Sequence, residues 1–393
     1  MTFDLKNGDL LKTMNIYSKL PDVGVTIFTV MSKLANDAGA INLSQGFPDF
    51  DVSAELCELV TKYMASGHNQ YAPMQGVPSL RQRIAEKTEE LYGAQYDPDT
   101  EITVTSGATE AIFSAITCVV NRGDEVILFE PAYDAYAPDV LLAGGVPVYV
   151  QLKYPDYHVD WNEVTDAITK KTKLLILNSP HNPTGAILGV EDMKALIDIV
   201  ADTNIFIVSD EVYEHIVFDG HRHESMARYP ELARRSFVIS SFGKTYHTTG
   251  WKLGYCLAPK QLSVEFQRVH QFVTFASHTP TQFAYAEFME KKEKYLTLPD
   301  FYQEKRDLFL SLIKDSRFRP LPCLGTYFQM LSYADITDEK DIDFAKRLTT
   351  EHKVAAIPPS VFCVGGDDHK VLRFCFAKKN ETLIKAAEKL CKI

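Results

Sequence analysis

The sequence feature that most constrains the fold is a series of short, almost uniformly apolar segments separated by stretches with helical spacing. Six such segments follow one another through the middle of the chain, at 102–105, 125–129, 146–150, 174–177, 205–208 and 237–240. A strand that is apolar on both sides must be covered on both sides, which is typical of parallel sheets between helix layers. We therefore expect an α/β fold built on a mainly parallel sheet.

The last part of the chain has a different pattern. After residue 302 the sequence changes to a smaller mixed unit, with strands expected near 326–330 and 371–376. A chain of 393 residues is also too long for a single small core. We predict a large domain at 49–290, a small α+β domain at 291–393, and an N-terminal arm at 1–48 that forms part of the small domain.

Composition excludes several classes of function. The formal net charge is −11, whereas nucleic-acid binders carry a basic footprint. No apolar stretch is long enough to cross a bilayer, and residues 1–7 lead into no apolar region of a secretory signal. The seven cysteines are scattered without a C-x-x-C pair, which argues against a disulfide framework or structural zinc. We expect a cytoplasmic protein with no metal, nucleic-acid or membrane partner.

Polar residues follow several of these strands, where an open α/β sheet collects its ligands. Residues 106–110 open a helix with small side chains, whose bare N–H groups suit a phosphate, although an ordinary helix cap would look the same. The Pro- and Gly-rich loop at 178–185 leaves Asn182 free to donate to an anionic oxygen, as a plain turn also would. Asp210 ends the next strand with Tyr213 three positions later, so both groups can face one ligand, unless Asp210 merely caps a helix.

Lys244 follows the last strand, in a Gly-rich segment. A lysine amine becomes nucleophilic when burial or a neighbouring cation lowers its pKa, which is the requirement for a Schiff base. Lys252 could supply that cation or neutralise a phosphate.

Eight segments together resemble the fold-type I pyridoxal-phosphate (PLP) aminotransferases of class I/II. They are INLSQGFPDF (41–50), NQYAPMQGVPSLR (69–81), TSGATEA (105–111), FEPAYDAY (129–136), NSPHNPTG (178–185), SDEVYEHI (209–216), SSFGKTYHTTGWKLGY (240–255) and RFCFAK (373–378). Each is weak alone, but eight in family order are very specific. The chain is most similar to the branch of methionine aminotransferases and kynurenine or glutamine transaminases. The resemblance implies the PLP-dependent transferase fold with a seven-stranded sheet, PLP as cofactor, and a homodimer with a shared active site.

The resemblance also assigns cofactor roles, motif by motif. Lys244 resembles the lysine that holds PLP as a Schiff base, and Asp210 the carboxylate that faces the pyridine nitrogen and keeps it protonated. Tyr213 and Asn182 match the pair that hydrogen-bonds the phenolic oxygen of the ring, and Tyr133 the aromatic stacked on it. The positions of the phosphate cup are occupied by Ser106, Gly107, Ala108, Thr109, Ser241 and Lys252.

Substrate roles follow in the same way. Arg373 resembles the arginine that clamps the substrate α-carboxylate, helped by Asn182 and the backbone at Gly46, and a planar guanidinium can bind both carboxylate oxygens at once. Tyr71 resembles the tyrosine that reaches across the dimer to the partner's phosphate. Once freed by the substrate amine, Lys244 would move a proton from Cα as general base and acid.

Two departures from the family bear on the substrate. Many relatives have arginine where this chain has Lys252, a feature shared by certain kynurenine and methionine transaminases. The segment 273–280 also lacks the arginine with which dicarboxylate-specific relatives bind the distal carboxylate. We predict that Phe28, Phe275 and His278 form walls of an apolar, aromatic pocket, and that the amino donors are methionine and aromatic or apolar amino acids, with kynurenine or glutamine as further candidates.

Alternative functions remain on the same scaffold. A cysteine-S-conjugate β-lyase (carbon–sulfur lyase) would use the same Lys244 to remove the same proton and then expel a β-leaving group, and the sequence leaves this alternative open. A non-enzymatic PLP-binding regulator would need a DNA-binding domain, for which the roughly 40 residues before Gly46 are too few and not basic.

Two further motifs favour other chemistry only weakly. Residues 241–244 match the S-x-x-K of penicillin-interacting serine enzymes, but neither S-D-N nor K-T-G is present. His215, His221, His223 and Glu224 invite a metal-site interpretation but lack the i, i+4 histidine pair of H-E-x-x-H. We expect a solvated loop there.

Overall fold

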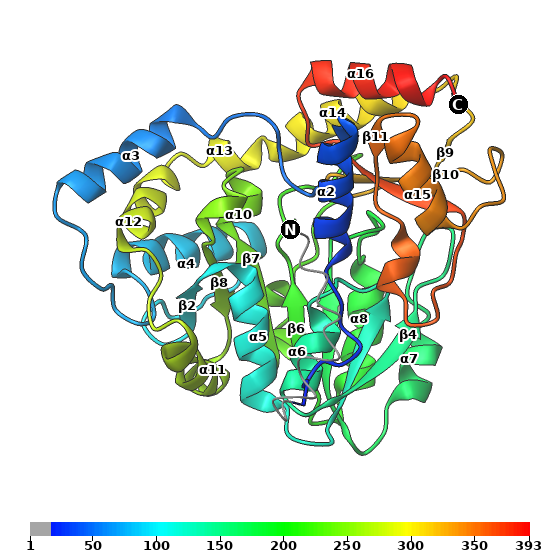
Figure 1. Cartoon of the computed structure of the whole chain (residues 1–393). Helices are drawn as coiled ribbons and strands as arrows, with labels where there is room; N and C mark the ends of the chain where they lie inside the picture. Colours follow the sequence, from blue (N-terminus) through cyan, green and yellow to red (C-terminus); the bar gives the residue numbers. More distant parts are fainter. Residues whose placement is uncertain (1–16) are drawn as a thin grey trace.

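The structure is a computed structural model that describes residues 17–393 (Figure 1). Residues 1–7 and the rest of the predicted N-terminal arm up to residue 16 lie outside the described residues. In the part of the chain that is described, no helix combines the length and apolarity needed to span a membrane.

A seven-stranded sheet forms the centre of the molecule, in the order β2-β8-β7-β6-β5-β3-β4. Its strands are β2 (Ile102–Thr105), β3 (Glu125–Glu130), β4 (Val146–Gln151), β5 (Thr172–Asn178), β6 (Phe206–Asp210), β7 (Ser236–Ser241) and β8 (Gly254–Leu257). All adjacent pairs are parallel except those of β8, which runs antiparallel to both β2 and β7. The prediction of a mainly parallel seven-stranded sheet is confirmed, although β8 itself had not been predicted as a strand.

Both faces of this sheet are buried, which is why its strands are apolar at successive positions. In β3, Val126 and Leu128 pack into one hydrophobic core, whereas Ile127 and Phe129 pack into the other. The first core takes in α5 (Gly107–Val119), α6 (Tyr136–Leu142) and α11 (Lys260–Val273). The second takes in α3 (Ala54–Ala65), α4 (Pro78–Tyr92), α7 (Trp161–Ala167), α8 (Val190–Val200) and α12 (Thr279–Phe288). The short elements are η1 (Met226–Arg228), α9 (Pro230–Ala233), α10 (Phe242–Thr245), η2 (Thr249–Trp251) and α13 (Glu293–Leu296).

The C-terminal part forms a smaller mixed unit joined by the N-terminal segment. Its antiparallel sheet has the order β12-β10-β9. The elements are α14 (Leu298–Leu312), β9 (Arg319–Pro320), β10 (Phe328–Ser332), α15 (Asp341–Thr350), β11 (Val354–Ala355), η3 (Pro359–Phe362), β12 (Val371–Cys375) and α16 (Asn380–Leu390). From the other end of the chain, β1 (Ile41–Asn42) pairs with β11, and α2 (Ile27–Ala38) packs against α15 (Figure 1).

The carboxyl ends of the parallel strands meet at one edge of the sheet. Asn178 pairs in register with Asp210 at the ends of β5 and β6, and Ser241 ends β7. Because β8 runs the opposite way, its first residue, Gly254, lies at the same edge, paired with Ser241 and Thr105. A Cβ at Gly254 would lie 3.0 Å from the amide nitrogen of Ala108, so a glycine is needed for α5 to begin this close to the sheet.

The expectation of a solvated 215–224 loop is wrong for three of its four candidate side chains. His215, His223 and Glu224 are buried. Two of them have hydrogen-bond partners there: His223 Nε2 lies 2.8 Å from a carboxylate oxygen of Glu211, and Glu224 accepts a hydrogen bond from Tyr229. Among residues 17–393, no group of three or more His, Cys, Asp or Glu side chains is arranged to hold a metal ion.

Candidate active site

A cavity of about 310 Å³ lies at the edge of the sheet where β5, β6 and β7 end. Most of the side chains predicted from the sequence line it. They are Phe28, Gly46, Gly107, Ala108, Thr109, Tyr133, Asn182, Asp210, Tyr213, Ser241, Lys244, Lys252 and Arg373. A cavity of this size, with a few charged groups among apolar walls, is typical of small-molecule sites.

Lys244 projects from α10, the single helical turn that follows β7. Burial lowers the pKa of its amine to about 8, and the nearby Arg373 and Lys252 act in the same direction. Its Nζ donates to the hydroxyl of Tyr327 at 2.8 Å and to the Gly46 carbonyl at 3.2 Å. A larger fraction of this amine than of an exposed lysine is therefore neutral and nucleophilic near neutral pH.

Asp210 is the last residue of β6 and is only 5% exposed. Burial raises the pKa of its carboxyl to about 6, although a hydrogen bond from Tyr136 lowers it. The Tyr136 hydroxyl donates to Oδ2 at 2.6 Å, and the Val212 N–H donates to Oδ1 at 3.2 Å. Asp210 caps no helix, since a turn follows it. The carboxylate is thus held in place and has little contact with water, as a partner for a buried cation requires.

The first turn of α5 forms an anion cradle. Ser106 occupies the N-cap position, but its side chain makes no capping hydrogen bond, and the helix begins at Gly107 in the left-handed conformation (φ 78°). Lys252 Nζ lies 3.5 Å from Thr109 Oγ1. Free N–H groups, the positive end of the helix dipole and a lysine together suit a phosphate.

Arg373, on β12, is fully buried at the cavity wall. Its Nη1 donates to Asn182 Oδ1 at 2.7 Å and its Nη2 donates to the Ser44 carbonyl at 2.8 Å. The guanidinium carbon lies 3.9 Å from the centre of the Phe328 ring. Burial lowers the pKa of the guanidinium to about 10, so it stays cationic at neutral pH. Within the described residues Nε has no hydrogen-bond partner, and the group is suited to bind an anion entering the cavity.

Four predicted residues do not line the cavity of their own chain. Tyr71 is 85% exposed, and Phe275, whose ring centre is 5.5 Å from that of Tyr71, is 45% exposed. His278 is exposed, with Nδ1 2.7 Å from the Thr281 hydroxyl. Ser106 Oγ instead lies 3.2 Å from Ser277 Oγ. The structure of one chain therefore does not bring these side chains to the lysine.

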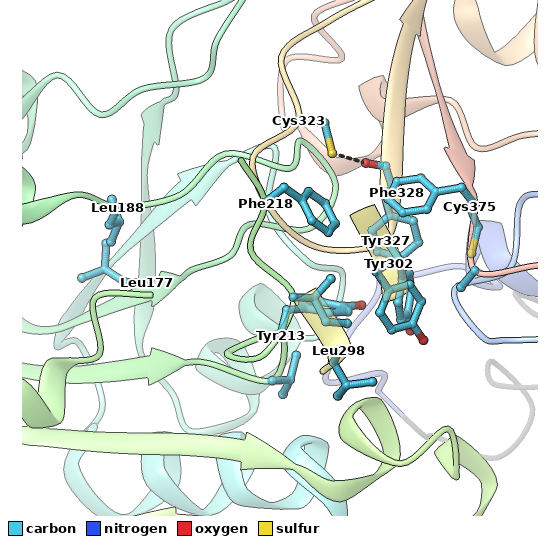
Figure 2. Close-up of a cluster of buried hydrophobic side chains, with 14 of the residues drawn as sticks. Leu177, Leu188, Tyr213, Phe218, Leu298, Tyr302, Cys323, Tyr327, Phe328 and Cys375 are labelled. Carbon is cyan, nitrogen blue, oxygen red and sulfur yellow. Dashed lines mark hydrogen bonds between the residues drawn. The ribbon is translucent and has the colours of Figure 1, made fainter. Parts of the chain in front are cut away.

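Among the residues that the sequence analysis did not single out, Tyr136 and Phe328 line the cavity and Tyr327 contacts Lys244. Tyr136 belongs to the segment 129–136, which was recognised for Tyr133 alone. Tyr327 and Phe328 lie around the start of β10, and Figure 2 shows them beside Tyr213 and Tyr302 in the aromatic cluster under the cavity. Two adjacent aromatic residues at the start of a strand are common in hydrophobic cores. The sequence alone therefore does not show which groups these residues contact.

Comparison with known proteins agrees with this geometry. A sequence model of the family described as "Aminotransferase class I and II" matches residues 38–390. The chain belongs to this family. It is therefore an aminotransferase, as predicted, and nothing in the site or in these comparisons favours the carbon–sulfur lyase. Enzymes of class I and II are PLP-dependent and act on amino acids and 2-oxo acids.

Three relatives of this aminotransferase illustrate its branch. It is 51% identical to the methionine aminotransferase of Escherichia coli, over 95% of this chain and 97% of the relative. It is 36% identical to a probable N-succinyldiaminopimelate aminotransferase of Mycobacterium tuberculosis (95% and 97%) and 35% identical to a kynurenine–oxoglutarate transaminase of Dictyostelium discoideum (94% and 94%). A crystal structure of an Escherichia coli protein identified as a methionine aminotransferase superposes with a TM-score of 0.95 at 51% identity, covering 96% of this chain and 99% of that one.

Proposed function

We propose that this aminotransferase takes the amino group of methionine and of aromatic or apolar amino acids. The observation that carries the proposal is the charge inventory of the cavity. Its lining holds three cations, Lys244, Lys252 and Arg373. One is needed for the cofactor aldehyde, one for its phosphate and one for the substrate α-carboxylate. Among residues 17–393 of one chain, no lining cation is left for a second carboxylate, which would be costly to bury unpaired.

The apolar walls of the cavity fit such a side chain. Phe28, Tyr133 and Phe328 line it, and the Phe28 ring centre is 5.2 Å from the Arg373 guanidinium carbon. A donor held by Arg373 would therefore place its side chain against aromatic carbon. The E. coli relative is named for methionine and the Dictyostelium relative for kynurenine, so both substrates agree with these walls; glutamine stays a prediction.

The cavity also fits PLP. When bound, PLP supplies the electron sink that stabilises negative charge developing at Cα. Lys244 would hold its aldehyde carbon, Asp210 its ring nitrogen, and Tyr213 and Asn182 its phenolic oxygen, with Tyr133 against the ring face. The phosphate would lie in the cradle of Gly107, Ala108, Thr109, Ser241 and Lys252.

The chain's own residues have separate roles in the proposed reaction. Arg373, with Asn182 and the backbone at Gly46, fixes the α-carboxylate and with it the orientation of the Cα–H bond. The Lys244 amine takes up the Cα proton, which its lowered pKa allows near neutral pH. Asp210 would pair with a protonated ring nitrogen of the cofactor, and the positive charge there would in turn favour the ionised carboxylate.

A second copy of the chain would complete the site. Tyr71, Phe275 and His278 are exposed and do not line the cavity of their own chain. We propose that in a homodimer Tyr71 contacts the partner's phosphate while Phe275 and His278 reach its substrate side. We also propose the division into a large domain at 49–290 and a small one at 291–393 with the 1–48 arm. The pairing of β1 with β11 supports the assignment of the arm to the small domain.

A donor screen with the PLP-loaded enzyme tests the proposal. We expect kcat/KM for methionine and phenylalanine to exceed that for aspartate by at least about 100-fold, the cost of an unpaired buried carboxylate. Comparable turnover of aspartate would refute the charge argument. Pyruvate released from a cysteine conjugate without any 2-oxo acid would instead indicate the lyase.

A further inference from the structure

Three polar atoms form a compact triangle beside the cavity. Lys244 Nζ lies 2.8 Å from the Tyr327 hydroxyl and 3.2 Å from the Gly46 carbonyl oxygen, and the two oxygens are 2.6 Å apart. Because the two oxygens are closer to each other than either is to the nitrogen, both lie in the same direction from the nitrogen. Lys244 and Gly46 line the cavity, whereas Tyr327 does not, so the phenol lies behind the amine as seen from the cavity.

The direction of these hydrogen bonds is determined by chemistry. A carbonyl oxygen can only accept, so the single proton of the Tyr327 hydroxyl goes to Gly46. The phenol oxygen is then left to accept an N–H from Lys244. Burial raises the pKa of Tyr327 well above its ordinary value, so the phenol keeps its proton while the lysine gains and loses one.

We propose that Tyr327 is the positioning residue of the Lys244 amine: by accepting an N–H on the side away from the cavity, it directs the lone pair of the neutral amine into the cavity. This role rests on the proposed function of Lys244 and adds to it the residue that orients the nucleophile. An unrestrained lysine amine rotates freely on a four-carbon stem. Restricting that rotation increases the rates of proton transfer and of reaction with a carbonyl group.

The phenol is itself held rigidly. Tyr327 is fully buried, and its ring packs edge-to-face on Tyr213 with centres 5.1 Å apart at 86°. A Cβ at Gly46 would lie 2.9 Å from the Phe328 ring, so the backbone at Gly46 packs closely against that ring. Both acceptors therefore stay in place when the amine moves.

The chain provides a matched control. Tyr302 is also fully buried, its ring centre is 5.7 Å from that of Tyr327, and Figure 2 shows both rings in one cluster. Within the described residues its hydroxyl has no hydrogen-bond partner. Tyr302→Phe and Tyr327→Phe thus remove the same atom from neighbouring buried rings, and only the second touches the lysine.

The experiment compares the two variants in two ways. In the cofactor-free protein, the rate of PLP capture at Lys244 is followed by absorbance and by borohydride trapping with peptide mass analysis. In the loaded enzyme, kcat, KM and the isotope effect of α-deuterated methionine are measured. For Tyr327→Phe we expect at least fivefold slower capture, at least tenfold lower kcat, less than threefold change in KM and a larger isotope effect. Tyr302→Phe should match the unmodified protein within twofold.

Equal behaviour of the two variants would overturn the proposal, as would a Tyr327→Phe defect confined to KM. Thermal unfolding checks that both variants fold. If Tyr327→Phe does not, 3-fluorotyrosine at 327 keeps the ring and the hydroxyl but makes the oxygen a weaker acceptor and the O–H a stronger donor, and unchanged capture would again overturn the proposal. Failure of the proposed function is distinct, because it would leave the unmodified protein itself without trapped cofactor at Lys244.

Discussion

The Tyr136 hydroxyl donates a 2.6 Å hydrogen bond to Asp210 Oδ2, and the phenol is only 3% exposed. This bond opposes the effect of burial, which raises the pKa of Asp210 to about 6. Tyr136 therefore helps to keep the carboxyl ionised in a site with little water. Since the proposed ring nitrogen needs an anion beside it, the phenol bears directly on activity.

Replacing Tyr136 with phenylalanine should make activity more sensitive to acid. Loss of the bond raises the pKa of Asp210 further, so the active carboxylate is lost at a higher pH as the pH falls. A hydrogen bond to a charged group contributes about 1.5–3 kcal/mol, so kcat/KM at pH 6 should fall about tenfold. A pH profile from 5 to 8 measures the shift. Tyr96→Phe is the control, since that buried hydroxyl has no partner among residues 17–393; an identical profile for Tyr136→Phe would contradict the assignment.

Lys244→Ala should abolish both turnover and the absorbance of covalently held PLP. Loss of the proton-transfer group lowers kcat by about 100-fold to 10,000-fold. In the cofactor-free protein, the rate of PLP capture should rise with pH and level off above the pKa of about 8, because only the neutral amine attacks. Lys194→Ala, at an exposed lysine on α8, should change nothing. A retained spectrum in Lys244→Ala would mean that another lysine holds the cofactor.

Arg373→Lys should weaken the binding of every amino donor. Lysine cannot bind two carboxylate oxygens, and it leaves the Ser44 carbonyl and Asn182 without their partner. Breaking a buried charged pair costs about 3–5 kcal/mol, which corresponds to at least about 100-fold in kcat/KM. Steady-state kinetics with methionine and alanine should show similar losses, because both carry the α-carboxylate. A loss confined to methionine would place Arg373 on the side-chain pocket instead.

Phe28→Ala should affect large donors selectively. The ring lines the cavity and packs 5.8 Å from Phe362 between centres. Removing apolar wall from a pocket changes discrimination by about 1–3 kcal/mol, so kcat/KM for methionine and phenylalanine should fall about tenfold or more. Alanine, whose methyl group does not need that wall, should lose less than about threefold. Equal losses for all three donors would show a general distortion.

The buried ion pair between Lys87 and Glu214, which does not line the cavity, should contribute strongly to the free energy of unfolding. The two side chains are 6% and 3% exposed and 2.6 Å apart. Burial raises the pKa of Glu214, but Lys87, His215 and a hydrogen bond from Tyr92 outweigh it and hold the pKa below its ordinary value. Lys87→Met should therefore lower the free energy of unfolding by about 3–5 kcal/mol, measured with urea at pH 7.

The control and the pH dependence make this prediction specific. Lys33→Met breaks an exposed pair with Asp37 and should cost less than about 1 kcal/mol. Since Glu214 has a lowered pKa in the folded state, its contribution is present above its unfolded pKa and is lost as the pH falls. A difference between the unmodified protein and Lys87→Met that stays constant down to low pH would contradict this account.

The sheet and the cavity could be predicted because their signals are local. A strand buried on both faces is apolar at successive positions, and a motif at its end shows which side chain enters the site, as for Asp210 and Lys244. β8 was missed because its four residues follow a glycine-rich segment in which only the short α10 and η2 form, with no long amphipathic helix before the strand. Its reversal in the sheet is a tertiary feature without a periodic signature.

The partners of the site residues could not be predicted in the same way. Tyr136 and Asp210 are 74 positions apart, and Lys244 and Tyr327 are 83 apart, so their contacts depend on the tertiary packing of distant segments. For Tyr71, Phe275 and His278 the sequence identifies a family position but not which copy's cavity the side chain enters. The burial of the 215–224 side chains was also not predicted, because the hydrogen-bond partners Glu211 and Tyr229 lie outside that range.

The site is assembled from opposite ends of the polypeptide: Gly46 lies in the loop after the first strand, β1, and Arg373 lies on the last strand, β12. A chain synthesised only as far as β8 contains the anion cradle, Asp210 and Lys244 but not Arg373. The side chain proposed to hold the substrate carboxylate is thus the last of the site residues to be synthesised.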